Sequence, residues 1–155
     1  MEERLIKVGI THGDINGIGY EVILKTFSDA RVAELCTPVI YGSSKIAAYH
    51  RKALELPPVN MNIISQAEDA GINRVNIINC VDDETKVELS QSTSIAGEAA
   101  FLALEAAVTD LKRGAVDVLL TAPINKHNIQ NDEFHFPGHT EYLEERFGGV
   151  GRKAL

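Results

Sequence analysis

The chain has 155 residues, which fits a single domain, and 45% of them are hydrophobic, enough to bury a core. Its formal net charge of −7 argues against nucleic acid or an anionic membrane as the main partner. Cys36 and Cys80 form no CxxC pair, and the first residues lack the apolar stretch of a signal peptide. No apolar run approaches the ~20 residues of a membrane span. We therefore expect a cytoplasmic protein with reduced thiols and no nucleic-acid or membrane partner.

The first half of the chain alternates apolar, β-branched runs with segments of helical spacing. The runs predict strands, and the first of them ends in a Gly-rich turn. Ser43 or Ser44 is the expected N-cap of the second helix, which Pro57 ends. In chain order the predicted elements are a strand at 5–11, a helix at 20–27, a strand at 38–42, a helix at 45–56, and strands at 61–65 and 75–79.

The second half contains the clearest helix, predicted over residues 95–113, with apolar side chains on one face and Gly114 at its C-cap. It leads into residues 116–120, an apolar run that predicts a buried strand, and a last helix is predicted over residues 141–147. Strands that alternate with helices indicate an α/β fold, a parallel or mixed sheet covered by helices on both faces. We expect one such region over residues 1–155.

A Gly-rich turn joins the first predicted strand to the first predicted helix. Gly13, Gly17 and Gly19 permit unusual backbone angles and let backbone N–H groups approach a ligand, while the helix N-terminus favours an anion. With Asp14 they are candidate ligand-binding residues. Their spacing matches neither GxGxxG nor a Walker A loop. The alternative is a tight turn in which Asp14 or Asn16 caps the helix.

Two further polar motifs follow the last predicted strand. Lys126 closes the run Thr121-Ala-Pro-Ile-Asn-Lys126 and is a compact cation suited to phosphate or carboxylate. His139 and Thr140 precede the last helix, with Thr140 as its N-cap and free N–H groups behind it, although Glu141 would compete with an anion. Open α/β sheets bind ligands at this edge, so the placement predicts a small anionic substrate such as a phosphate ester. The alternatives are a solvated lysine, a capping threonine and a half-buried histidine.

Three nearby histidines suggest a metal site, but the sequence argues against it. Phe136-Pro-Gly138 separates His135 from His139, so these two do not share a helical face, and His127 has no ligand at a matching spacing. No Ser/His/Asp set is defined by the order of residues. We therefore assign no metal ligand and no catalytic residue in this chain.

Three motifs occur in a fixed order along the chain: Gly13-Asp-Ile-Asn-Gly-Ile-Gly-Tyr-Glu21, Thr121-Ala-Pro-Ile-Asn-Lys126 and Phe136-Pro-Gly-His-Thr-Glu141. Together they resemble the 4-hydroxythreonine-4-phosphate dehydrogenase family. The segment 97–118 is also similar, so the resemblance spans nearly the whole chain. It implies a fold like that of isocitrate and isopropylmalate dehydrogenases, whose first strand ends in a comparable Gly-Asp-Gly-Ile-Gly loop.

The resemblance implies an enzyme of pyridoxal 5′-phosphate (vitamin B6) biosynthesis. It would oxidise 4-phosphohydroxy-L-threonine with NAD or NADP, and the 2-amino-3-oxo acid would decarboxylate to 3-amino-2-oxopropyl phosphate. A divalent metal (Zn, Mg or Co) would polarise the substrate hydroxyl, and family members are homodimers with the active site at the interface. His139 and Thr140 match the family's substrate-binding Gly-His-Thr motif, and Lys126 matches the lysine that closes its Thr-x-Pro motif. The candidate cofactor-binding residues are Gly13, Asp14, Gly17 and Gly19.

This sequence departs from the family in two ways. Ile15 and Tyr20 stand where the first loop commonly has prolines, while its glycines and acids are kept. Family members are also considerably longer, and their metal-ligand histidines and most of the cofactor site lie beyond the point that matches Leu155. Residues 148–155 end without a polar tail, which is typical of a cut. We expect a C-terminally truncated fragment that is inactive alone and binds NAD poorly.

Two other functions remain open. A paralogue that oxidises 4-phospho-D-threonate or 4-phospho-D-erythronate shares the same motifs, and its substrates carry a hydroxyl in place of the amine at carbon 2. A non-catalytic module that binds phosphorylated ligands through the first loop and Lys126 would need neither NAD nor metal.

Overall fold

A parallel β-sheet forms the centre of the computed structural model, which describes residues 4–147. Its strands are β1 (Lys7–Thr11), β2 (Thr37–Gly42), β3 (Met61–Ile64), β4 (Val75–Asn79) and β5 (Val118–Thr121). Their order is β3-β4-β2-β1-β5, and each neighbouring pair among the described strands is parallel. Parallel neighbours need crossover connections, which helices usually supply. The predicted α/β class is confirmed.

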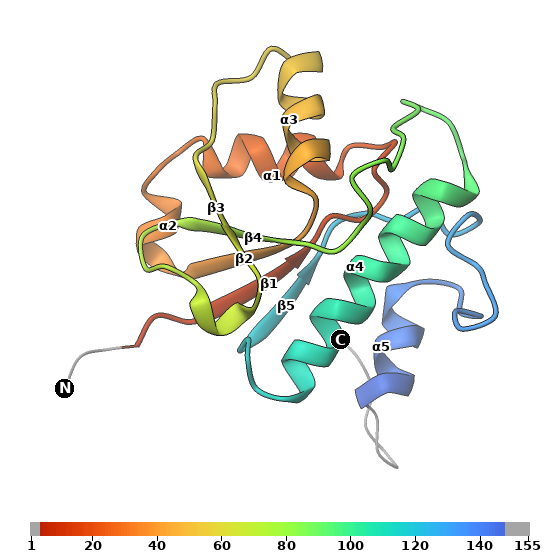
Figure 1. Ribbon diagram of the computed structural model, residues 1–155. Coiled ribbons are helices and arrows are strands. Elements are labelled where there is room, and N and C mark those ends of the chain that lie inside the picture. The colour runs from red at the N-terminus through yellow and green to blue at the C-terminus, as the bar shows by residue number, and fades with distance from the viewer. Residues whose placement is uncertain (1–3, 148–155) are drawn as a thin grey trace.

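Helices cover both faces of the sheet (Figure 1). They are α1 (Gly19–Phe27), α2 (Val32–Leu35), α3 (Ser44–Ala53), α4 (Ser94–Lys112) and α5 (His139–Phe147), with a 3₁₀ turn at Ala67–Asp69. On one face, Ile23 of α1 packs in a cluster with Ile10 and Ile40 of the sheet. On the other face, Ala103 of α4 packs with Val39. α3 joins a cluster with α1, and α5 joins one with α4.

Capping residues define the ends of α3 and α4. The Ser43 side chain accepts a hydrogen bond from a first-turn N–H of α3 at 3.2 Å, which confirms it as the N-cap. Thr93 does the same for α4 at 3.1 Å. Gly114 follows α4 with a φ of 80°, and the next N–H bonds back to the Asp110 oxygen at 2.8 Å. This is the glycine-ended helix terminus that the sequence predicts.

Two helical details differ from the sequence prediction. α3 ends at Ala53 instead of Leu56, because Glu55 adopts a left-handed φ of 54° before Pro57 is reached. α2 and the 3₁₀ turn were not predicted. They have four and three residues, too few for a helical period to show in the sequence.

The prediction of a buried strand at residues 116–120 is wrong for β5, which begins at Val118 and has exposed side chains on one face and partly exposed ones on the other. Among the described strands β5 lies at the edge of the sheet, beside β1. Val118 and Leu120 pair in register with Val8 and Ile10, on the face that α1 covers over β1 and β2. α1 does not extend over β5, so Val118 and Leu120 are 45% and 59% exposed.

α5 begins slightly earlier than predicted. Its first residue is His139, so Thr140 lies inside the first turn and is not the N-cap. The helix is attached to α4 by Tyr142, which packs with Phe101, and by an ion pair between Arg146 and Glu105. The predicted cut at 148–155 and the first residues of the N-terminus, 1–3, lie outside the described residues.

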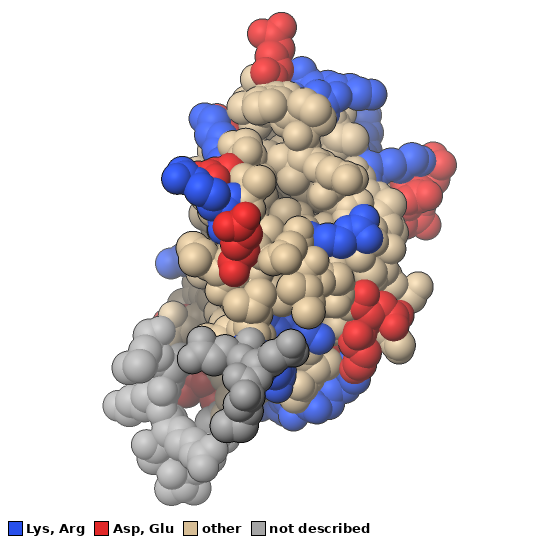
Figure 2. Space-filling model, turned by 90° about the vertical axis from the view of Figure 1, so that its left-hand side faces the viewer, with Lys and Arg blue, Asp and Glu red and all other residues tan. Residues whose placement is uncertain are grey.

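The surface in Figure 2 carries Lys and Arg side chains interspersed with Asp and Glu around uncharged areas. Neither sign of charge dominates that face, and the expectation that no nucleic acid binds stays a prediction. Cys36 and Cys80 are both free thiols, as predicted. None of the helices in residues 4–147 has the length and apolar character needed to cross a bilayer.

Candidate functional site

The first loop and the loop after β5 lie against each other because β1 and β5 are neighbours in the sheet. Gly13 has a φ of 66°, and a Cβ there would overlap the Pro123 carbonyl oxygen. Asp14 donates its N–H to that same oxygen at 2.8 Å. A Cβ on Gly19 would overlap the His12 carbonyl oxygen. Gly13 and Gly19 therefore permit close backbone packing, and their part in cofactor binding stays a prediction.

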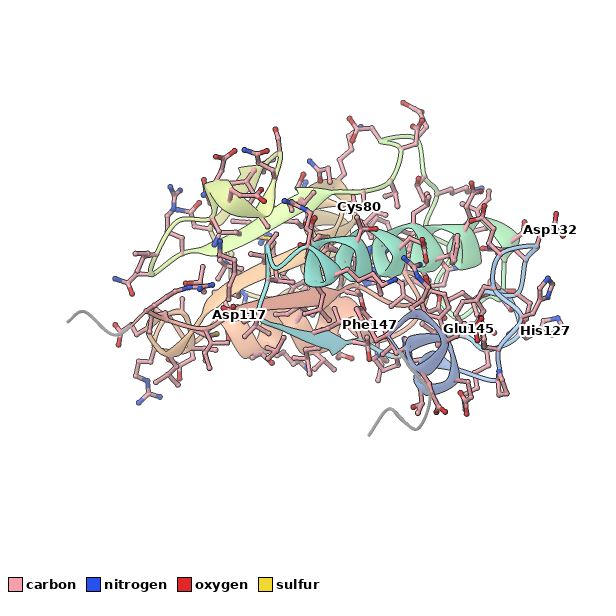
Figure 3. All side chains as sticks on the ribbon, turned by 90° about the horizontal axis from the view of Figure 1, so that it is seen from below. Cys80, Asp117, His127, Asp132, Glu145 and Phe147 are labelled. Carbon is pink, nitrogen blue, oxygen red and sulfur yellow. The ribbon has the colours of Figure 1, made fainter. Side chains whose placement is uncertain are left out.

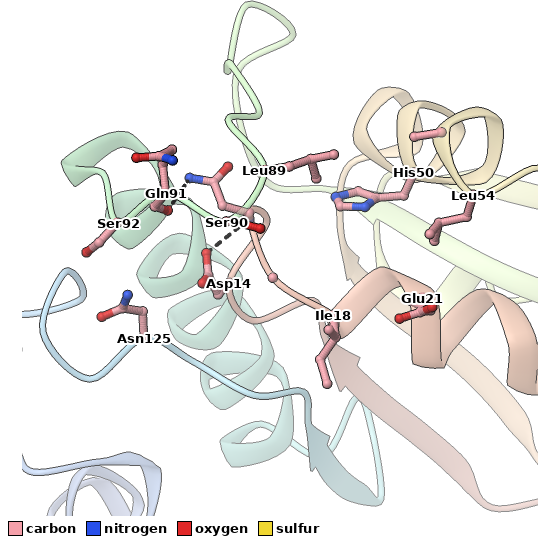
Figure 4. Close-up of a pocket in the computed structure, with 13 residues that line it drawn as sticks. Asp14, Ile18, Glu21, His50, Leu54, Leu89, Ser90, Gln91, Ser92 and Asn125 are labelled. Atoms are coloured by element: carbon pink, nitrogen blue, oxygen red, sulfur yellow. Dashed lines mark hydrogen bonds between the residues drawn. The ribbon is translucent and has the colours of Figure 1, made fainter.

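A pocket of about 400 Å³ opens beside the first loop (Figure 4). It lies between that loop, α3 and the segment that precedes α4, at the carboxyl edge of the sheet. Asp14 and Gly17, two of the predicted site residues, line it. Its other polar lining residues were not predicted from the sequence; they are Asn16, Glu21, His50, Ser90, Gln91, Ser92 and Asn125.

Asn16 fixes one wall of this pocket. Its side-chain oxygen accepts the Glu88 N–H at 2.7 Å, and its amide donates to the Gln91 oxygen at 3.0 Å. Asp14 in turn accepts the Asn16 N–H at 3.0 Å. No side chain caps α1, so the alternative that Asp14 or Asn16 caps it is wrong. Both residues shape the loop instead.

A buried hydrogen-bond network supports the pocket. His12 Nε2 lies 2.9 Å from the Ala99 carbonyl oxygen, which can only accept, so we assign the ring proton to Nε2. His12 Nδ1 then accepts from the Tyr20 hydroxyl at 2.8 Å, whose oxygen accepts the Ser43 N–H at 2.8 Å. Complete burial lowers the pKa of His12 to about 4, so the ring is neutral at pH 7. Tyr20 thus links the residue that follows β1 to the residue that follows β2.

His50 of α3 lines the pocket and is 2% exposed. Its Nε2 donates to the Ile15 oxygen at 2.7 Å, and its ring stacks on Tyr20 with centroids 5.4 Å apart. Burial lowers the pKa of His50, which favours the neutral ring with a lone pair on Nδ1. The sequence offered one signal for this residue. His50 lies four residues after Ile46, on the apolar face of α3.

The remaining predicted residues meet at the start of α5. A Cβ on Gly138 would lie 3.8 Å from Lys126 Nζ and 3.6 Å from Glu141 Oε2. The Gln130 amide donates to the backbone oxygens of Lys126 and Phe136 at 2.9 and 2.7 Å. These two bonds hold the loop after β5 against the segment that enters α5. Lys126 therefore lies next to the first turn of α5.

His139 is half-buried, and its Nε2 is buried without a hydrogen-bond partner among residues 4–147. Burial and, to a smaller extent, the charge of Lys126 lower the pKa of His139, so the ring is neutral at pH 7. A buried nitrogen without a partner costs free energy that a ligand oxygen or hydroxyl can recover. Thr140 is exposed beside it. A lysine, this histidine and the open first turn of a helix can together bind a small anion.

The described residues provide no metal centre of their own. Within residues 4–147 no group of three or more His, Cys, Asp or Glu side chains is placed to hold a metal ion. His127 and His135 are exposed, and Figure 3 shows His127 pointing away from the protein. The expectation that metal ligands lie beyond Leu155 stays a prediction.

A parallel sheet with ligand-type loops at its carboxyl edge is the arrangement found in α/β proteins that bind small molecules at that edge. Comparison with protein families identifies which one. Residues 34–154 match the sequence model of the family described as pyridoxal phosphate biosynthetic protein PdxA. The chain belongs to this family.

Individual relatives agree with this assignment. The chain is 60% identical over all 155 residues to a 4-hydroxythreonine-4-phosphate dehydrogenase of Bacteroides thetaiotaomicron, of which it covers 42%. It is 32% identical over 143 residues, 89% of the chain, to a "Putative D-threonate 4-phosphate dehydrogenase" of Clostridium botulinum, of which it covers 42%. The crystal structure of a 4-hydroxythreonine-4-phosphate dehydrogenase from Burkholderia phymatum matches with a TM-score of 0.82 and 29% identity, over 94% of this chain and 44% of that one. The chain spans less than half the length of these relatives.

Proposed function

We propose that this chain forms the N-terminal part of a dehydrogenase that oxidises 4-phosphohydroxy-L-threonine with NAD or NADP and a divalent metal. The product, 2-amino-3-oxo-4-phosphonooxybutanoate, would decarboxylate to 3-amino-2-oxopropyl phosphate in pyridoxal phosphate biosynthesis. The observation that carries the proposal is the 60% identity, over the whole chain, to a relative named for this activity. The proposal includes a cytoplasmic location and a homodimer of the longer protein.

Lys126, His139 and Thr140 are the proposed substrate-binding residues. Lys126 supplies a cation for the phosphate or carboxylate of the substrate. His139 supplies a buried nitrogen without a partner in the described residues, and it lies beside that cation. The first N–H groups of α5 have no acceptor within the helix itself and add further donors for an anion.

The pocket beside the first loop fits part of a nicotinamide dinucleotide. Asp14 and Glu21 line it, and no lysine or arginine does among the described residues. Carboxylates accept hydrogen bonds from ribose hydroxyls and repel phosphates, so the residues fit a ribose ring with the phosphates outside. The bound nicotinamide would supply the hydride acceptor, while this chain holds and orients the ribose. The residues described here do not fit the metal, and no step is assigned to it.

A second candidate is oxidation of 4-phospho-D-threonate or 4-phospho-D-erythronate. The 32% identity to the Clostridium botulinum relative supports it, at a lower level than the 60% identity that supports the first. The two classes of substrate share the phosphate that Lys126 would bind and differ at carbon 2.

A chimera tests the proposal directly. Residues 1–155 would replace the matching part of the Bacteroides thetaiotaomicron relative, and NADH or NADPH formation would be measured with added divalent metal. We expect oxidation of 4-phosphohydroxy-L-threonine in preference to 4-phospho-D-threonate, and no turnover by the 155-residue chain alone. Preference for the sugar acid would move the proposal to the second candidate. If neither is oxidised but phosphorylated hydroxy acids bind without cofactor, the protein is a binding module.

The role of Lys126 is tested in the same chimera. Lys126→Met removes the cation and keeps the length of the side chain, so we expect KM to rise about tenfold or more, the effect of losing one hydrogen bond to a charged group. Lys52→Met, at an exposed position of α3, is the matched control and should leave KM unchanged. An unchanged KM in Lys126→Met would remove Lys126 from the substrate site.

A further inference from the structure

We propose that Gln130 is a positioning residue: its side-chain amide fixes the backbone of Lys126 beside the first turn of α5, so that the lysine is already in place when an anionic substrate group arrives. The inference deepens the proposed function and rests on it, because it takes Lys126 as a substrate-binding residue. Gln130 lies between the two motifs that end at Lys126 and begin at Phe136, and it belongs to neither.

A single amide group joins the two segments that carry the proposed site. Nε2 of Gln130 lies 2.9 Å from the Lys126 oxygen and 2.7 Å from the Phe136 oxygen. Both partners are carbonyl oxygens, which only accept, so the amide nitrogen faces them and donates one proton to each segment. A hydroxyl has one proton and could hold only one of the two segments. The loop between them, with His127 and Asp132, lies at one end of the molecule (Figure 3).

The segment that enters α5 is held independently of Gln130. The Phe136 ring packs edge-to-face on Phe134 and on Tyr142, with ring centroids 5.5 Å apart in both pairs. Phe134 and Tyr142 are themselves buried in one cluster with Phe101 of α4. The Phe136 oxygen is therefore a fixed point to which Gln130 attaches.

Lys126 depends more strongly on the Gln130 amide. Lys126 is exposed, and its side chain extends toward the other segment, where a Cβ on Gly138 would lie 3.4 Å from Cε and 3.8 Å from Nζ. Within residues 4–147 the backbone of Lys126 makes one hydrogen bond, the one from Gln130. Loss of the amide therefore releases Lys126 from the segment that enters α5 and leaves that segment in place.

The consequence for the substrate is a change in affinity. If the backbone of Lys126 must be ordered at the moment of binding, the lost conformational entropy weakens binding roughly five- to thirtyfold for one residue. The phosphate and the carboxylate of the substrate keep their charges while the hydroxyl is oxidised, so Lys126 binds them equally before and during that step. Removing such an interaction raises KM and leaves kcat unchanged.

Kinetics of the chimera described above test the inference. Gln130→Met keeps the length of the side chain and removes both donors, so we expect KM for the oxidised substrate to rise roughly five- to thirtyfold, with kcat within about twofold of the wild type. Gln66→Met, at an exposed glutamine that caps nothing with its side chain, is the matched control and should change neither constant. A variant that is merely less stable would show a lower kcat at unchanged KM, because fewer molecules are folded. That result would overturn the inference.

A double-mutant cycle shows whether Gln130 acts through Lys126. In the chimera that carries Lys126→Met there is no cation to position, so adding Gln130→Met should change KM by less than about twofold. If Gln130→Met raises KM by the same factor with and without the lysine, Gln130 acts independently of Lys126 and the positioning role is wrong.

Binding of inorganic phosphate, measured by calorimetry on the same chimera, separates this inference from the proposed function. An inactive chimera whose Kd for phosphate rises in both Lys126→Met and Gln130→Met would support the inference and contradict the dehydrogenase. An active chimera in which Gln130→Met changes neither KM nor the Kd for phosphate would support the dehydrogenase and overturn the inference. An inactive chimera without phosphate binding that depends on Lys126 would overturn both.

Discussion

Gly97 lies where α4 meets the turn that follows Lys126, and a Cβ there would overlap the Asn128 carbonyl oxygen. Gly97→Ala would gain up to about 1 kcal/mol of helix propensity. Backbone cannot move aside as a side chain can, so the overlap should cost more, about 2–3 kcal/mol. We expect a net loss of about 1–2 kcal/mol in the free energy of unfolding, measured by urea denaturation.

The neighbouring Glu98→Ala is the control for Gly97→Ala. Glu98 is exposed, so this substitution should change the free energy of unfolding by less than about 0.5 kcal/mol. A Gly97→Ala protein that is as stable as the wild type would show that the turn adjusts without cost.

His12 predicts how stability depends on pH. Burial lowers the pKa of His12 in the folded protein to about 4, below its ordinary value of 6.5, so the unfolded chain takes up the proton first as the pH falls. The stability is therefore complete above pH 6.5, is lost as the pH falls toward 4, and changes no further below it. The shift corresponds to about 3 kcal/mol, and the lowered pKa values of His50 and His139 act in the same direction.

The measurement for His12 is the free energy of unfolding at intervals between pH 7 and pH 4, in wild type and in His12→Gln. The variant is expected to be less stable at pH 7 and to show a flatter dependence over this range. If the free energy of unfolding changes with pH equally in the two proteins, residues other than His12 cause the acid sensitivity.

Sequence patterns proposed some of the residues that line the candidate pocket and could not indicate the others. Asp14 and Gly17 lie within one short Gly-rich turn between a predicted strand and a predicted helix, so adjacent residues were enough to make them candidates. His50 and Ser90 reach the same pocket from separate segments that only the folded sheet brings together. No local period or motif encodes such a meeting, and this explains why the pocket was not predicted.

At the level of elements, α4 depends on its N-cap. The Thr93 hydroxyl accepts the Ala96 N–H at 3.1 Å and also receives the Asn16 amide at 3.2 Å, which connects the cap to the pocket wall. Thr93→Ala should cost about 1 kcal/mol in the free energy of unfolding, the usual cost of losing a cap. Thr93→Ser keeps the hydroxyl and should lie close to wild type in the same denaturation experiment. Equal losses in both variants would assign the effect to the methyl group.

The elements themselves were largely predictable, because their signals are local. The apolar runs, the Ser43 cap and Gly114 define the strands and helix ends from adjacent residues. The exposure of β5 was not predictable from the same signals. An apolar run has the same sequence pattern in the centre and at the edge of a sheet. The exposure of its side chains depends on whether another strand and its covering helix lie beyond it.

At the scale of the whole molecule, the β5 edge predicts association of the 155-residue chain. Val118 and Leu120 present an apolar, exposed strip on a strand edge that no other strand within residues 4–147 covers, the combination that promotes pairing between chains. We expect the apparent mass in sedimentation to rise with protein concentration, and Leu120→Lys to reduce this rise. Leu35→Lys removes an even more exposed leucine, 77%, from α2 and is the control. Association that is equal in both variants would exclude the edge.

The pairing of β1 with β5 also affects the order in which the parts of the protein can fold. Gly13 and Asp14 rest on the backbone of Ala122 and Pro123, more than a hundred residues later in the chain. The entropy cost of closing so long a loop comes before the stabilising contacts form, and this makes such pairings slow. During synthesis, the first loop therefore cannot form its contacts with the segment after β5 until residues 118–123 have left the ribosome. The earliest motif to be translated is among the last to reach its final shape.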